Sequence, residues 1–188
     1  MLGTLAAFAL VKYKRFFGRT VFSGMINAPL VMPEVILGLS ALLLFVGMQQ
    51  AVGWPAGRGM ATIAIAHVTF CSCYATVVVR ARLAQLDPAL GEAAMDLGAR
   101  PLAVFFRITL PLIAPALVAG WLLSFTLSLD DLVVASFTSG PGSSTLPMLI
   151  YSKVKLGVTP EMNALATIVI GVVAVFVAIA AWMLRQRE

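Results

Sequence analysis

The chain has 188 residues, of which 61% are hydrophobic and only 11% are charged, with a formal net charge of +5. A soluble domain carries about 25% charged residues, and a single soluble core could not bury this much apolar surface. The composition therefore excludes an ordinary soluble domain and indicates a protein whose solvent is mostly lipid. Because the basic residues cluster between apolar runs, they indicate membrane topology rather than nucleic-acid binding.

Apolar runs follow one another along the chain, and a helix that spans a bilayer needs about 20 such residues. The first eleven residues are apolar but too few to span, so we expect the domain to be truncated at its N-terminus. With this partial span, five membrane segments are predicted, at 1–11, 26–52, 60–79, 112–137 and 162–184. The prediction is an all-α, polytopic membrane helical bundle that forms a single domain over residues 1–188.

The connections between these segments differ in their content of Lys and Arg. Ten basic residues fall on one side of the membrane and three on the other, which places the C-terminus in the cytoplasm. The ten are Lys12, Lys14, Arg15, Arg19, Arg80, Arg82, Arg100, Arg107, Arg185 and Arg187, and the three are Arg58, Lys153 and Lys155. Before the last segment, Thr159-Pro160-Glu161 is typical of a helix start.

The cytoplasmic segment 80–111 is too polar to span and too regular to be a linker. Asp87, followed by a proline, predicts the cap of a short amphipathic helix. Gly98 stands where the residue after a helix adopts a left-handed conformation. Pro101 then starts a second short helix, and Pro111 is expected to end the unit. The pattern predicts a compact helix–turn–helix at the membrane surface, a shape suited to contact with a partner.

The same segment resembles the cytoplasmic loop of binding-protein-dependent ABC importer permeases. That loop reads E-A-A, three residues, G, nine residues and I-x-L-P, and the matching residues here are Glu92, Ala93, Ala94, Gly98, Ile108, Leu110 and Pro111. The resemblance implies the type I permease fold of these importers and a coupling helix that docks on a cytoplasmic ABC ATPase dimer. It also implies that the ATPase, and not this chain, binds ATP and Mg.

Further stretches, over nearly the whole chain, resemble the spermidine/putrescine-type permeases, and above all their putrescine member. These stretches are 28–34, 125–132, 139–142 and 145–147. The resemblance implies polyamine transport across the bacterial inner membrane, beside a second homologous permease subunit and a periplasmic polyamine-binding protein. A permease of the same family for ferric iron, sulfate or an amino acid stays open, as does a non-transporting scaffold subunit.

Three acidic residues lie in apolar runs, where a charged side chain is costly and usually functional. Glu34 follows Pro33, which together with Pro29 we expect to break the helix, and broken helices in membranes line sites. Asp130 and Asp131 lie near the outer end of the fourth segment. We expect these acids to supply negative field along the substrate path. The alternative is that they cap helices or pair with a partner subunit, and the sequence does not distinguish which acid faces the path.

The remaining polar residues in the spans predict packing rather than chemistry. His67 has Cys71 one turn away, but no third metal ligand is at hand, so no metal site is expected, and His67 is interpreted as a polar packing residue or a donor that lines the pore. Cys71 and Cys73, two residues apart on a helix, face different directions and are not expected to pair. No catalytic constellation or nucleotide-binding motif is found in the sequence. Small residues that recur every four positions predict a tight helix–helix contact: Ala116, Gly120, Ser124 and Ser128.

Overall fold

The computed structural model describes residues 1–13, 15–157 and 160–185. Every regular element in these ranges is helical, which confirms the predicted all-α class. Three helical runs within them are long and apolar enough to cross a membrane, namely α3 (Glu34–Val52), α4 (Met60–Ala84) and the run Pro101–Asp130. Contacts divide the chain into two units, Met1–Ser144 and Thr145–Glu188.

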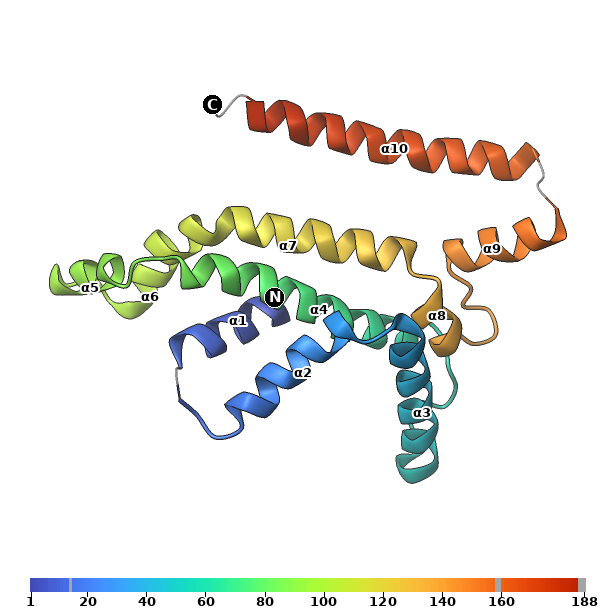
Figure 1. Ribbon diagram of the computed structural model, residues 1–188, viewed down its shortest axis with the longest axis horizontal. Helices are drawn as coiled ribbons and strands as arrows, with labels where there is room; N and C mark the ends of the chain where they lie inside the picture. The colour runs from blue at the N-terminus through green and yellow to red at the C-terminus, as the bar shows by residue number, and fades with distance from the viewer. Residues whose placement is uncertain (14, 158–159, 186–188) are drawn as a thin grey trace. The chain divides into compact units, whose positions relative to one another are not determined.

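Helix α4 is the centre of the first unit. Half of the residues in its most apolar stretch are buried, because it packs against α1 (Leu2–Lys12), α2 (Arg19–Val31) and α7 (Leu110–Asp130). Figure 1 shows α4 and α7 running side by side. The 25 residues of α4 extend about 37 Å at 1.5 Å per residue, more than the roughly 30 Å of a bilayer core.

Buried apolar side chains join these helices in two clusters. The first joins α1, α4 and α7 and consists of Ala7, Val79, Leu83 and Ile113. The second joins α1, α2 and α4 and consists of Leu10, Ile26 and Cys73. Both cysteines are free, and Cys71 faces α7, where its thiol donates to the Ser124 carbonyl oxygen at 3.4 Å. The prediction that the two cysteines face apart is confirmed.

The small-residue stripe of α7 is the face that packs on α4. Gly120 is buried, and a Cβ added to it would lie 3.6 Å from the Cα of Ala75. The Ser124 hydroxyl donates to the Cys71 carbonyl at 3.3 Å, and Ser128 contacts His67. For these three positions on α7 the predicted helix–helix contact is confirmed.

Two predicted segments are each divided between two helices. The expected segment 26–52 comprises the C-terminal part of α2, from residue 26 onward, and all of α3, with the break at Met32 and Pro33. Only Pro33 breaks the chain, since Pro29 lies inside α2. The expected segment 112–137 comprises α7 and the short α8 (Val133–Thr138), separated by an extended residue at Asp131.

The segment 80–111, which was predicted to be cytoplasmic, also differs from the prediction at both ends. Helix α4 continues to Ala84, so only the residues from 85 onward leave it. The expectation that Pro111 ends the unit is wrong. A four-residue helix, α6 (Pro101–Val104), leads through a π-helical turn, η1 (Phe105–Thr109), directly into α7. Proline lacks an N–H and crowds the preceding turn, and the wider π turn accommodates it without breaking the helix.

The second unit contains α9 (Leu146–Leu156) and α10 (Pro160–Arg185). Helix α10 begins at Pro160, as predicted, whereas Thr159 lies outside the described residues.

Helix α8 is held against α3 and the start of α4. The Arg58 guanidinium donates to the Phe137 carbonyl at 3.3 Å, and the Thr62 hydroxyl donates to the Thr138 carbonyl at 2.7 Å. A Cβ at Gly38 of α3 would lie 2.5 Å from the Phe137 ring, so the two elements meet without room for a side chain. These contacts fix α8 at the N-terminal end of α4.

We predict that Gly38→Leu destabilises the protein by about 1–3 kcal/mol, the usual cost of overpacking a well-packed contact. The added side chain would displace Phe137 and with it α8. Thermal unfolding of the detergent-solubilised protein measures the effect. Gly47→Leu on the same helix is the matched control, because a Cβ at Gly47 meets no atom within 4 Å. Equal melting temperatures for the two variants would contradict the assigned contact.

Candidate functional site

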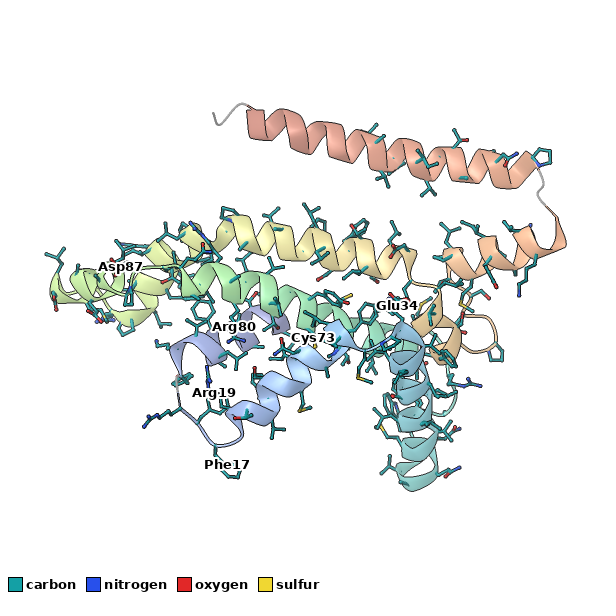
Figure 2. The ribbon with its side chains drawn as sticks, viewed as in Figure 1. Phe17, Arg19, Glu34, Cys73, Arg80 and Asp87 are labelled. Carbon is teal, nitrogen blue, oxygen red and sulfur yellow. The ribbon has the colours of Figure 1, made fainter. Side chains whose placement is uncertain are left out.

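A cavity of about 170 Å³ lies where α3 begins and α7 ends. Four elements and the turn between α7 and α8 form its wall. The lining residues are Glu34, Leu37, Phe70, Tyr74, Leu127, Asp130, Asp131, Leu132, Val133 and Val134. Figure 2 labels Glu34 at the first residue of α3, close to the corner that leads into α8. We call this space the acidic cavity.

All three acids expected from the sequence line the acidic cavity, although about 96 positions of the chain separate Glu34 from the other two. The break at Pro33 brings the start of α3 to the end of α7, because α3 packs on α8. Glu34 and Asp130 are exposed, whereas Asp131 is buried. The cavity therefore collects three carboxyl groups, two of them accessible.

Asp131 is occupied by contacts within the protein. Its Oδ1 accepts the Val134 N–H at 3.1 Å, and its Oδ2 accepts the Ala135 N–H at 2.7 Å. These two amides belong to the first turn of α8, where N–H groups have no partner inside the helix. His67 Nε2 lies a further 2.9 Å from Oδ2. Asp131 therefore caps α8 and ties it to α4, the alternative that the sequence left open for this acid.

Two aromatic residues of the wall were missed by the sequence analysis. Phe70 and Tyr74 are half-buried on α4 and line the cavity, and α4 carries none of the three acids. The signal was present, since His67, Phe70 and Tyr74 are three and four residues apart and share one helix face. Aromatic faces attract organic cations, and they add to the field of the carboxylates.

The segment expected to be cytoplasmic forms the predicted short helix, α5 (Ala89–Asp96). An Asp87 carboxylate oxygen accepts the Ala89 N–H at 2.9 Å, as expected of a cap. At the other end, the Ala99 N–H donates to the Ala94 carbonyl at 3.0 Å and the Gly98 N–H to the Met95 carbonyl at 2.9 Å. Gly98 has a φ of 85°. This pair of bonds with a left-handed glycine is a Schellman motif, which turns the chain sharply.

The residues of the predicted coupling motif lie on both parts of this turn. Glu92, Ala93, Gly98 and Pro111 are exposed, and Ala94, Ile108 and Leu110 are half-buried. Figure 1 shows α5 and α6 together at one end of the α4–α7 pair, remote from α8. The motif therefore forms one surface, separated by the length of α7 from the acidic cavity.

Exposed apolar side chains surround this surface. Leu97 is 90% exposed, Leu102 72% and Phe106 59%. Between α5 and the ends of α1, α4 and α7 lies a second cavity of about 300 Å³, lined mostly by apolar residues. A surface of this kind, on a polar loop, is typical of an interaction site.

Comparisons with known proteins agree with these features. Residues 1–187 match the family model described as "Binding-protein-dependent transport system inner membrane component". The chain is 62% identical, over 187 residues, to the putrescine transport system permease protein PotI of Escherichia coli, and it covers 66% of that protein.

Two more distant relatives carry a related description. The spermidine/putrescine transport system permease protein PotC of Haemophilus influenzae is 47% identical over 171 residues, which are 90% of this chain and 63% of PotC. The PotC homolog of Mycoplasma pneumoniae is 34% identical over 169 residues, 90% of this chain and 57% of that protein. The chain thus spans between 57% and 66% of the length of these relatives, which is less than two thirds. With its apolar spanning helices and the match over 1–187, it belongs to the family of binding-protein-dependent transport system inner membrane components, multi-pass membrane proteins with an all-α permease fold.

Proposed function

We propose that this chain is a transmembrane permease subunit of an ATP-binding cassette importer that moves polyamines, putrescine or spermidine, across the bacterial inner membrane. It is not itself an enzyme and binds no cofactor, because ATP and Mg belong to a separate cytoplasmic ATPase dimer. A second homologous permease subunit and a periplasmic polyamine-binding protein complete the importer. The C-terminus lies in the cytoplasm. The 62% identity to a putrescine permease supports this choice of substrate.

The observation that carries the proposal is the acidic cavity. A polyamine presents ammonium groups joined by methylene chains, and both parts have counterparts in the wall. Carboxylates of Glu34 and Asp130 are accessible to the ammonium groups, which offsets the cost of removing them from water. Apolar residues such as Leu37, Leu127 and Val133 lie beside them and suit the methylenes.

The charge of the cavity also weighs against two of the alternative solutes. Sulfate is an anion and would be repelled by the acids that line this space, and these acids would repel the carboxylate of a zwitterionic amino acid while attracting its ammonium group. A ferric ion would gain nothing from the apolar and aromatic part of the wall. Of the solutes considered, a flexible organic cation matches the wall best.

The surface formed by the coupling motif is connected to the acidic cavity by one helical run. The run Pro101–Asp130 has 30 residues, which at 1.5 Å per residue extend about 45 Å from the α5 turn to the acids. Helix α5 packs on α6 at the start of this run, so that displacement of α5 by a closing ATPase is transmitted along α7. This geometry supports a role of the coupling motif in alternating access.

The experiment that tests the function uses the assembled importer in proteoliposomes, with the binding protein outside and ATP inside. We expect ATP-dependent uptake of labelled putrescine or spermidine, and no uptake of sulfate, ferric iron or an amino acid under the same conditions. Uptake of one of those solutes instead would overturn the polyamine assignment. Absence of any ATP-dependent uptake by a correctly assembled complex would favour the scaffold alternative.

A second prediction concerns the docking surface. A photo-crosslinking residue placed at Glu92 is expected to capture the ATPase subunit, because this exposed position lies on α5, the proposed coupling helix. The control is the same crosslinker at Trp54, which is 44% exposed in the connection between α3 and α4. That position is predicted to lie on the outer side and should capture no ATPase. Failure at Glu92 in an inserted and assembled protein would contradict the docking role.

A further inference from the structure

A buried polar network joins α4 to the corner between α7 and α8, behind the wall of the acidic cavity. His67 Nδ1 lies 2.7 Å from Ser128 Oγ, and His67 Nε2 lies 2.9 Å from Asp131 Oδ2. The side chains of His67 and Asp131 are only 11% and 5% exposed. The imidazole also packs edge-on against Phe70 of the wall, with ring centroids 5.3 Å apart. The function proposed above does not use this network.

The donors around Asp131 define the role of the imidazole. The carboxylate already accepts two backbone N–H groups of α8, so the His67 contact supplies a third donor. An ionised carboxylate can only accept, and Nε2 must therefore carry a hydrogen. In the neutral ring, Nδ1 is then the acceptor for the Ser128 hydroxyl. The negative charge of Asp131 is therefore stabilised by hydrogen bonds from α8 and from the imidazole.

We propose that His67 is a positioning residue of the polyamine site. It keeps the carboxylate of Asp131 turned into the protein. Only two carboxylates, those of Glu34 and Asp130, then face the substrate, instead of three. The inference rests on the polyamine function proposed above and concerns the specificity of the same site. Two free carboxylates match the two ammonium groups of a diamine, whereas a third would favour a triamine.

Removal of the His67 imidazole frees the carboxylate of Asp131, which is the third negative charge. Asp131 loses one of its three donors, and water enters the space that the ring vacated. Asp131 already forms part of the cavity wall, so its negative field then extends into the site. The change favours a substrate with one more positive charge.

The test is the ratio of spermidine uptake to putrescine uptake by the assembled importer in proteoliposomes, with binding protein saturated by each polyamine in turn. We expect His67→Ala to raise this ratio roughly two- to fivefold, the range that a charge pair supplies once water has entered the site. His67→Gln, whose amide can still donate to Asp131, should shift the ratio less. Asp131→Asn added to His67→Ala removes the released charge and should return the ratio toward that of the wild type.

Thr69→Ala is the matched control on the same helix, because the Thr69 hydroxyl only donates to the Ile65 carbonyl of its own helix. It should leave the ratio unchanged. An unchanged ratio in His67→Ala, or a changed ratio that Asp131→Asn does not reverse, would overturn the inference. If His67→Ala does not assemble, His67→Phe, which keeps a ring but cannot donate to Asp131, must shift the ratio in the same direction. A wild-type importer that carries neither polyamine would overturn the proposed function instead.

Discussion

Neutralising Glu34 and Asp130 together, as Glu34→Gln and Asp130→Asn, is expected to reduce polyamine uptake about 100-fold. Each of these exposed carboxylates lines the acidic cavity and is available to an ammonium group. A hydrogen bond to a charged group contributes about 1.5–3 kcal/mol, so the loss of one corresponds to roughly tenfold or more in rate. The measurement is ATP-dependent uptake of labelled putrescine by the assembled importer.

The controls separate charge from packing. Glu34→Asp and Asp130→Glu keep the negative charges and should retain more uptake than the neutral variants. Co-purification of the ATPase with each variant shows whether the complex has assembled. Uptake by the double neutral variant within about twofold of the wild type, in an assembled complex, would remove these two acids from the substrate path.

The acids were predictable from the sequence because an ionisable residue in an apolar run is rare and costly. The different contacts of these acids were not predictable. Asp130 and Asp131 are neighbours in the chain, and only the break after α7 turns one into the protein and leaves the other exposed. The partner of Asp131 is His67, 64 positions earlier, and no local pattern indicates which acid a distant histidine will contact.

The helical class and the bundle were likewise predictable, because composition and long apolar runs leave few alternatives. The positions of the helix breaks were harder. Pro33 is followed by a new helix, whereas Pro29 and Pro115 lie inside helices, although all three are prolines in apolar runs. Whether a proline ends a helix depends on what else can satisfy or replace the lost hydrogen bond, and this is decided by neighbouring elements.

The second large effect concerns the turn of the coupling loop. Gly98→Val is expected to lower ATP-dependent uptake about tenfold while the transmembrane helices remain inserted. The backbone at Gly98 has a φ of 85°, which costs an ordinary residue about 1–2 kcal/mol and a β-branched residue more. The strain would open the Schellman motif and displace α5, and with it Glu92, from the position in which we propose that it docks on the ATPase.

Asn at position 98 separates backbone strain from side-chain bulk. A Cβ at Gly98 meets no atom within 4 Å, so size alone should be tolerated there. Asn adopts the left-handed conformation more readily than Val, and Gly98→Asn should therefore keep most of the uptake. Photo-crosslinking from Glu92 to the ATPase should fall in the Val variant and persist in the Asn variant. If both variants lose uptake and crosslinking equally, then the added side chain, and not the backbone conformation, prevents binding of the ATPase. In that case the docking surface includes Gly98 itself.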